Sequence, residues 1–381
     1  MEAYLDNSAT TRAYPEVGDL VYKVMCQDYG NPSSMHRKGV DAEHYVKEAK
    51  ETIAKVLKVN AKDIYFTSGG TESDNLALIG CARANRRAGN HLITTSIEHP
   101  AILNTMRYLE EEEGFRVTYL PVDASGRVNL EALKEALCPE TILVSVMYVN
   151  NEVGTLQPID EAVKIVKEYN SSILFHSDAV QGFGKYHIYP KRQKIDLLSA
   201  SGHKIHGPKG VGFMYIRDGI DIPSFIHGGS QERGKRAGTE NVAGIVGMAK
   251  AAEIAYGNMR KRVQKEIMLR NYLIERVMHE IPDAKLNGHR SIRLPGNVNF
   301  SFKGLEGASL LILLDEDGIC ASGGSACNTG EERISYVIKA LGVPEEYAPG
   351  TIRITLCGDT TRADVDAALV SLKRNIAILR G

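Results

Sequence analysis

The sequence predicts an α/β protein with a large domain, built on a mostly parallel seven-stranded sheet, and a smaller α+β C-terminal domain. The chain has 381 residues, which is more than one hydrophobic core usually holds, because a domain has ~150 residues. Apolar runs alternate with helical stretches between residues 63 and 216, and the composition changes near Thr239. These observations together indicate two domains of different architecture.

Seven short runs rich in β-branched and aromatic residues predict the strands of the large domain. Stretches with helical periodicity, such as 72–89 and 160–171, lie between them. Alternation of this kind is typical of βαβ units and of a sheet that is covered on both faces. The predicted strands are 63–68, 90–96, 116–122, 141–149, 172–178, 196–201 and 210–216.

A helical pattern from Thr239 to about Ile281 is too long for one ordinary globular helix. Gly257 is the expected break, because the residues before it are small and apolar and those after it are basic and amphipathic. The expected domains are a large one over 15–256 and a small one over 1–14 and 257–381. The small domain is expected to hold strands at 296–302 and 351–356 and helices at 306–317, 335–341 and 364–376.

Composition and charge exclude several classes of protein. Lys and Arg number 46 against 47 Asp and Glu, so no basic surplus favours nucleic acid or an anionic membrane. The N-terminal residues lack the pattern of a signal peptide, and no apolar stretch is long enough for a bilayer. Six cysteines without a close pair fit neither a disulfide framework nor a zinc ribbon. We therefore expect a cytoplasmic protein without a permanent metal site.

Ligands of α/β sheets bind at the carboxyl ends of strands, and the first candidate site follows the strand at 63–68. Gly69 and Gly70 permit a tight turn there, and a helix is expected to begin at Thr71. Its free N–H groups and dipole would bind an anion. The alternative is that Thr71 is an N-cap with Asp74 three residues on, and that no ligand binds.

Asp178 ends a buried apolar strand, where an acid is costly unless a cationic group pairs with it. A protonated pyridine nitrogen is such a group, whereas the alternative is that Asp178 caps the next helix. Gln181, three residues on, is placed to contact the same ligand.

Lys204 lies between two predicted strands, in a tight loop rich in Gly, Ser and His. Burial would lower its pKa, and a neutral amine can form a Schiff base. Lys209 is the alternative, but its Gly-Pro-Lys-Gly turn favours exposure. His203 and His206 would be a weak metal pair, because no third ligand is evident nearby.

An anion site, an acid for a ring nitrogen and a lysine for an aldehyde together predict a pyridoxal phosphate site. His99 follows the strand at 90–96 and is a candidate to stack on the ring and transfer protons, although a single histidine is more often structural.

Two further features lie in the C-terminal domain. Cys327 is embedded in Gly, Ser and Ala, which predicts a mobile loop whose thiol can approach a substrate and withdraw. Cys320 follows a strand-like run and is expected to be buried, as are the remaining four cysteines. Arg353 is a charge inside an apolar strand, explained either by a substrate carboxylate or by an internal salt bridge.

In combination, these motifs resemble the cysteine desulfurases in the class V aminotransferase group of fold-type I pyridoxal phosphate enzymes. The resemblance extends from Tyr4 to about Leu372, and the cysteine loop is more similar to group I, the iron–sulfur-assembly type. It is carried by TSGGTESDN, EHPAI, NNEVG, HSDAVQ, SGHKIHGPKG, RAGTENV and SGGSAC.

The resemblance implies a role for each matching residue. Lys204 would be the Schiff-base lysine, Cys327 the nucleophile that accepts sulfur, and His99 the ring-stacking acid and base. Asp178 would pair with the ring nitrogen and Gln181 would donate to the ring hydroxyl. The phosphate ligands would be Gly70, Thr71, Ser201, His203 and, from the neighbouring subunit, Thr239. The substrate carboxylate would be bound by Asn151 and Arg353.

The resemblance also implies an activity and partners. L-cysteine would give L-alanine and a persulfide on Cys327, for delivery to acceptors such as iron–sulfur cluster assembly or tRNA thiolation. A homodimer with shared active sites is expected, and Cys327 could transiently ligate an iron–sulfur cluster. Alternatives are another class V aminotransferase or lyase, for example selenocysteine lyase, and a non-catalytic scaffold, although a scaffold has no need of Lys204.

Two segments depart from the family pattern. Residues 328–335 lack a Leu-Glu-Pro that relatives often show, and residues 356–359 replace the usual Leu-Gly-Arg. Neither segment includes a residue with an implied chemical role, so they leave open only which acceptor protein the cysteine loop serves.

Overall fold

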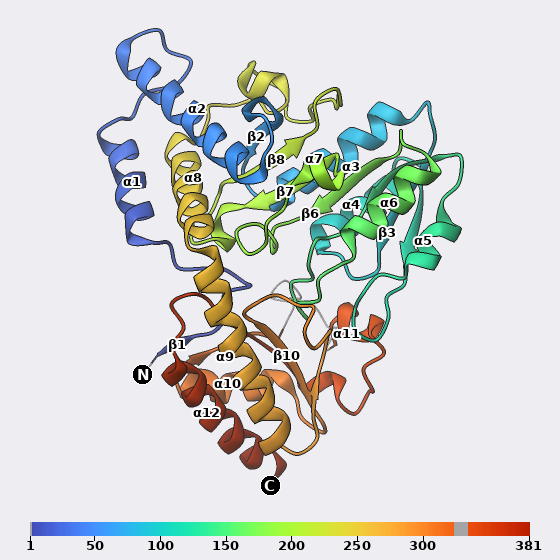
Figure 1. Cartoon of the computed structure of the whole chain (residues 1–381), viewed down its shortest axis with the longest axis vertical. Helices are drawn as coiled ribbons and strands as arrows, with labels where there is room; N and C mark the ends of the chain where they lie inside the picture. Colours follow the sequence, from blue (N-terminus) through green and yellow to red (C-terminus); the bar gives the residue numbers. More distant parts are fainter. Residues whose placement is uncertain (1, 324–333) are drawn as a thin grey trace.

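The computed structural model describes residues 2–323 and 334–381. Figure 1 shows two lobes, with a sheet and its covering helices in the upper lobe and a smaller sheet packed with helices in the lower one. Helix α9 (Met259–Glu280) continues from α8 (Val242–Gly257) into the lower lobe, so the helical pattern breaks beside Gly257 as predicted.

The large sheet has seven strands in the order β2-β8-β7-β6-β5-β3-β4. Five of these strands, from β7 to β4, pair in parallel, whereas β8 is antiparallel to both β2 and β7. This confirms the predicted mostly parallel sheet. The strands are β2 (Ile64–Thr67), β3 (His91–Thr95), β4 (Arg116–Leu120), β5 (Thr141–Ser145), β6 (Leu174–Asp178), β7 (Leu197–Ser201) and β8 (Gly212–Ile216).

Helices cover both faces of this sheet. Leu174 packs in the buried cluster that contains α3 and α4, whereas its neighbour Phe175 packs in the cluster that contains α2, α6 and α8. Because side chains alternate along a strand, His176 and Asp178 face the α3 side with Leu174. These helices are α1 (Pro15–Cys26), α2 (Arg37–Leu57), α3 (Gly70–Asn85), α4 (Pro100–Glu111), α5 (Leu130–Ala136), α6 (Ile159–Tyr169) and α7 (Pro190–Gln193).

The lower lobe has its own buried core. Ala3 and Leu5 at the N-terminal end join this core with apolar residues of β10, β12, α9 and α12. The core's separation from the clusters on the large sheet supports the proposed division into two domains. Its remaining elements are β1 (Ala3–Tyr4), β9 (Ala284–Leu286), β10 (Asn297–Phe302), β11 (Ile319–Cys320), β12 (Thr351–Thr355), α10 (Gly307–Glu316), α11 (Tyr336–Ala340) and α12 (Arg362–Arg380).

Within residues 2–323 and 334–381, every helix is too short or too polar to cross a membrane.

Candidate active site

A cavity of about 300 Å³ opens where strands β6 and β7 end. Its walls come from the large sheet, from the N-terminal segment at Ser8 and Ala9, and from β12 of the lower lobe. The sequence-predicted residues that line it are Gly70, Thr71, His99, Asn151, Asp178, Gln181, Ser201, His203, Lys204 and Arg353. Segments that lie far apart in the sequence therefore meet as expected.

The N-terminus of α3 forms one end of the cavity. Helix α3 begins at Gly70 after Gly69 as N-cap, so the alternative in which Thr71 is the N-cap is wrong. A Cβ on Gly70 would lie 2.6 Å from Cγ2 of Val180, so only glycine lets this helix end approach the end of β6. The first N–H groups of the helix have no intrahelical partners and favour an anion.

Two residues from the β7 end complete this part of the cavity. Ser201 is the last residue of β7 and is buried. His203 Nδ1 lies 3.2 Å from Thr10 Oγ1. Burial, and then the charge of Lys204, lowers the pKa of His203 to about 4, so its ring is neutral near pH 7.

Asp178 is buried at the end of β6. Its Oδ1 accepts a hydrogen bond from Val180 N at 2.9 Å within a turn, and no helix begins there, so the alternative in which Asp178 caps the next helix is wrong. Burial raises the pKa of Asp178, while His99, the Val180 N–H group and Lys204 oppose that shift. A cation bound in the cavity would favour the ionised form further.

His99 caps α4 with its own ring. Nδ1 accepts a hydrogen bond from Ala101 N at 3.1 Å, so the proton of the neutral ring is on Nε2. Burial lowers the pKa of His99, the Asp178 carboxylate opposes this shift and Lys204 adds to it. His99 therefore reaches the cavity as a neutral ring of fixed tautomer.

Lys204 projects into the cavity from the turn after β7. Nζ donates to Ser8 O at 2.7 Å and to Ala9 O at 2.6 Å. Burial, followed by the charges of Arg353 and Lys185, lowers the pKa of Lys204 to about 8. Lys209, the sequence alternative, is exposed as expected.

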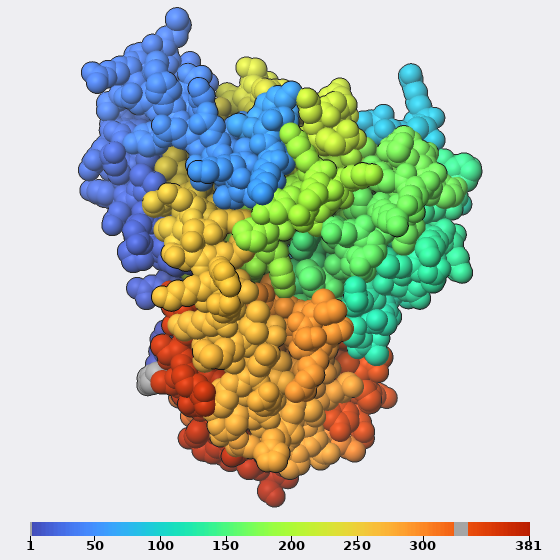
Figure 2. All heavy atoms as spheres, in the orientation of Figure 1, coloured from blue at the N-terminus to red at the C-terminus, as the bar shows by residue number. Residues whose placement is uncertain are grey.

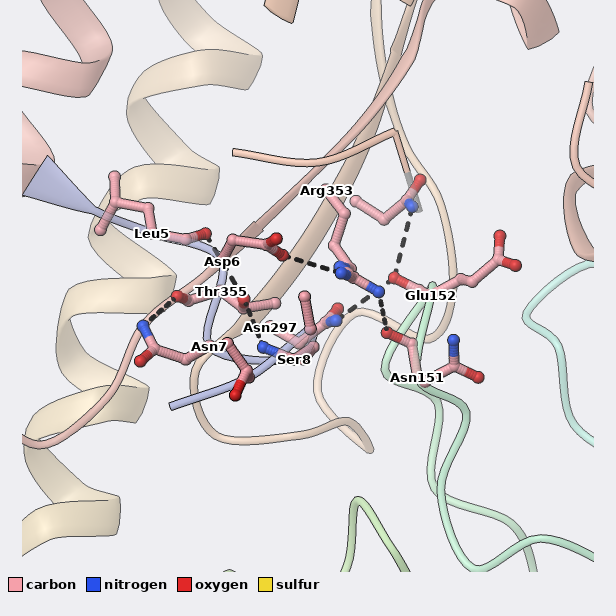
Figure 3. Close-up of polar contacts among 12 residues, drawn as sticks. Leu5, Asp6, Asn7, Ser8, Asn151, Glu152, Asn297, Arg353 and Thr355 are labelled. Atoms are coloured by element: carbon pink, nitrogen blue, oxygen red, sulfur yellow. Dashed lines mark hydrogen bonds and ion pairs between the residues drawn. The ribbon is translucent and has the colours of Figure 1, made fainter. Parts of the chain in front are cut away.

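Arg353 is buried at the lower wall, where Figure 3 shows its guanidinium directed at Asp6 and at the backbone of residue 151. Nη2 pairs with Asp6 Oδ1 at 2.8 Å and Nη1 donates to Asn151 O at 3.1 Å. The internal salt bridge is therefore present, and the side chain also lines the cavity. In the described part of the chain, the buried Oδ1 of Asn151 has no hydrogen-bond partner, which leaves that amide for a ligand.

The prediction did not include eight other residues that line the cavity: Ser8, Ala9, Asp74, Pro100, Met147, Val149, Glu152 and Val180. Asp74 is buried on α3, and burial followed by the Asp178 charge raises its pKa well above the usual value. Burial also raises the pKa of Glu152, whose Oε2 accepts a hydrogen bond from Ser335 Oγ at 2.6 Å. The position of Asp74, one helical turn after Gly70, was the signal that could have found it.

The remaining residues that the sequence singled out are not among the described residues that line this cavity. Cys327 lies outside the described residues, and Thr239 is exposed and does not line the cavity of its own chain. The burial expected for the cysteines is wrong for four of the five described: Cys26 is exposed, and Cys138, Cys320 and Cys357 are only half-buried, whereas Cys81 is buried as expected. Among the described residues, no group of three His, Cys, Asp or Glu side chains is placed to hold a metal ion.

Residues 3–368 match the family model of class V aminotransferases. The chain belongs to the class V aminotransferase family. It is 49% identical to "Cysteine desulfurase IscS" of Clostridium botulinum, and the matched region covers 98% of this chain and 94% of that protein. It is 48% identical to the protein of the same name from Methanosarcina thermophila, over 99% of this chain and 92% of that one.

Solved structures agree with this assignment. A structure titled "NIFS-LIKE PROTEIN" covers 100% of both chains with a TM-score of 0.94 and 41% identity. A NifS-like protein from Rickettsia africae matches with a TM-score of 0.88 and 32% identity over 99% of this chain. The predicted family and fold class are confirmed.

The residues present fit pyridoxal phosphate, the cofactor of this family. A free helix N-terminus suits its phosphate, a buried acid suits its ring nitrogen, and an amine of lowered pKa suits its aldehyde. These three groups line one cavity, so the cofactor prediction is confirmed.

Proposed function

We propose that this chain is a cysteine desulfurase that converts L-cysteine to L-alanine and leaves the sulfur as a persulfide on Cys327. One observation carries the proposal: a single cavity joins Lys204, Asp178 and His99 in a chain about half identical to proteins named cysteine desulfurase. The chemistry follows from what these side chains offer.

Bound pyridoxal phosphate supplies an electron sink for a carbanion at the substrate's Cα. We assign its phosphate to the N-terminus of α3, with Gly70 and Thr71, and to Ser201 and His203. Asp178 would hold a proton on the ring nitrogen by its negative charge, and the neutral ring of His99 would face the ring of the bound cofactor. Gln181 donates from its amide to the ring hydroxyl.

Lys204 serves twice in this proposal. Its amine holds the aldehyde in the resting protein and, once substrate releases it, takes the proton from the substrate's Cα. A pKa of about 8 leaves a substantial neutral fraction near pH 7, as both tasks require. Arg353 and Asn151 position the substrate carboxylate at the lower wall of the cavity.

Sulfur transfer is assigned to Cys327. Its thiolate attacks the sulfur of the bound cysteine, the carbon–sulfur bond of the substrate breaks as the new sulfur–sulfur bond forms, and the carbon fragment leaves as alanine after protonation. His99 Nε2 is the proposed site of proton transfer in this step, because its tautomer is fixed by the Ala101 N–H group.

A homodimer with shared sites is part of the proposal. Large apolar side chains are exposed on α1 and on the loop that follows it, which form the blue flank in Figure 2. They are Tyr22, Met25, Tyr29 and Met35, the last 98% exposed. Such a patch favours burial against a second copy, and the exposed Thr239 is then available to the partner's phosphate site.

Delivery of sulfur to iron–sulfur cluster assembly is proposed from the relatives named IscS, and the acceptor protein is not identified by the chain. Transient ligation of an iron–sulfur cluster by Cys327 remains part of this proposal. A cytoplasmic location is proposed because all five cysteines of the described residues are free thiols, which suits a reducing compartment.

A substrate competition tests the function. The purified protein receives equal amounts of ¹³C-labelled L-cysteine and unlabelled L-selenocysteine together with a keto acid, and labelled and unlabelled products are followed by mass spectrometry. Alanine formed from cysteine without consumption of keto acid supports the proposal. Amino-group transfer to the keto acid would identify a transaminase, and turnover restricted to selenocysteine would identify a selenocysteine lyase.

A further inference from the structure

A second half-buried lysine, Lys185, lies next to the proposed cofactor site. It follows Gln181 by four residues in the turn after β6. Its Nζ lies 3.3 Å from Gln181 Oε1, and Gln181 Nε2 donates to Ser8 O at 2.9 Å. Ser8 O also accepts from Lys204 Nζ, so the two lysines join through one short hydrogen-bonded chain.

This contact determines how the Gln181 amide is turned. A lysine ammonium has only donors, so it must face the amide oxygen of Gln181. The NH₂ group of Gln181 then faces Ser8 and the cavity that both residues line. Without Lys185, only the carbonyl oxygen of Ser8 would hold the amide in this orientation, and the end that faces the cavity would be less firmly fixed as a donor.

The charge of Lys185 also acts on Lys204 below about pH 8, because burial lowers the pKa of Lys185 itself to about 8. Both side chains line a second, very small cavity of about 10 Å³, the size of one water molecule. From α9, Arg262 and Glu266 face this cavity, and Glu266 is engaged by Arg262 at 3.2 Å. His206 and Cys357 complete its titratable lining, and Arg353 adds a positive charge from β12. Cations therefore outnumber the one acid, Glu266, in this small cavity, whereas Asp6 and Asp178 on the other side of Lys204 favour its charged form.

We propose that Lys185 is a positioning residue for the cofactor site: it fixes the Gln181 amide as a donor toward the cavity, and its charge favours the neutral amine of Lys204. The inference rests on the proposed function, because it assigns Gln181 and Lys204 to the cofactor. Three substitutions separate its two parts. Lys185→Arg keeps donor and charge, Lys185→Gln keeps a donor without charge, and Lys185→Met removes both.

The charge is tested on cofactor-free protein. Competitive acetylation with acetic anhydride, read by peptide mass spectrometry, gives the pH midpoint at which Lys204 becomes reactive. The midpoint is expected near pH 8 in the wild type, no higher in Lys185→Arg, whose charge persists above pH 8, and higher in Lys185→Gln and Lys185→Met. Lys164→Met, at an exposed position of α6, is the matched control and should leave the midpoint unchanged.

The amide orientation is tested with pyridoxine 5′-phosphate, which has no aldehyde and cannot react with Lys204. Titration calorimetry should show binding about fivefold weaker in Lys185→Met, the loss of roughly one hydrogen bond, and near wild type in Lys185→Gln. Gln181→Met should weaken binding equally, and the double variant should lose no more, since Lys185 acts through Gln181.

An unchanged Lys204 midpoint in Lys185→Gln, or additive losses in the double variant, would overturn the inference. If circular dichroism shows that Lys185→Met does not fold, Lys185→Gln still tests the effect of the charge on Lys204. Gln181→Met and Lys185→Arg then test the orientation of the amide, and Lys185→Arg must bind pyridoxine 5′-phosphate as tightly as the wild type does. Neither readout needs turnover, so a wild-type protein that forms no alanine would refute the proposed function alone.

Discussion

The ion pair between Asp6 and Arg353 predicts a specific loss of stability when its charge is removed. Arg353 Nη2 lies 2.8 Å from Asp6 Oδ1, with the two side chains 2% and 18% exposed. The contact joins the N-terminal segment to β12, whose residues pack in the core of the lower lobe. Asp6→Asn keeps the shape of the side chain and one acceptor oxygen but removes the negative charge.

The size of the expected loss in the free energy of unfolding follows from how deeply the ion pair is buried. Removal of one partner from a fully buried pair costs about 3–5 kcal/mol, and a hydrogen bond to a charged group contributes about 1.5–3 kcal/mol. Because Asp6 is partly exposed and asparagine retains an acceptor, we expect the free energy of unfolding to fall by about 2 kcal/mol. In a protein of 381 residues, that loss lowers the unfolding midpoint by about 2–3 °C.

Thermal unfolding followed by circular dichroism measures this effect. Asp315→Asn, at an exposed position of α10 in the same lobe, is the matched control and should shift the midpoint by less than about 1 °C. An Asp6→Asn protein as stable as the control would show that the ion pair contributes nothing, and the account of how Arg353 is held would be wrong.

Three further predictions concern the chemistry. Asp178→Asn should retain the fold but lose most turnover, because a neutral amide cannot hold the proton on the ring nitrogen. If the variant turned over cysteine at the wild-type rate, Asp178 would only cap the following turn. The pKa of Lys204 is lowered to about 8, so the rate at which cofactor-free protein captures pyridoxal phosphate should rise about tenfold for each pH unit from 6 to 8 and stay constant above pH 8. Stopped-flow absorbance measures this rate, and a rate that continued to rise up to pH 10 would contradict the lowered pKa. Cys320→Ser should keep most activity, since Cys320 ends β11 and is not the proposed nucleophile; its inactivity would move the thiol assignment.

The sequence predicted the site residues that follow strands. Lys204, Asp178 and His99 each stand at or just beyond the carboxyl end of a strand, and such ends meet at one edge of a parallel sheet, so the pattern was sufficient to bring them together. Arg353 was visible as a charge in an apolar strand, although its partner Asp6 was not, because nothing local links residues separated by almost the whole chain.

Other features left no usable pattern. Ser8 and Ala9 accept hydrogen bonds from Lys204 through their backbone carbonyl groups, and every residue type has such a group, so their side chains gave no signal. By contrast, helices α1 and α2 were not predicted although both carry an amphipathic pattern, with Val17 and Val24 buried on α1 and Ala49, Ile53 and Leu57 buried on α2. The expectation that Cys320 and Cys26 are buried was wrong because it rested on an average tendency of cysteine and not on neighbouring residues.

The central claim is that sulfur from L-cysteine passes to Cys327, and its most direct test combines one incubation with two readouts. Wild-type protein and Cys327→Ser are incubated with ³⁵S-labelled L-cysteine, alanine is quantified, and the peptide that carries residue 327 is analysed by mass spectrometry. The account predicts alanine together with a labelled persulfide on Cys327 in the wild type, and almost no alanine and no bound label in Cys327→Ser, which should still bind cysteine. Wild-type alanine production by Cys327→Ser, or label on another cysteine, would contradict it.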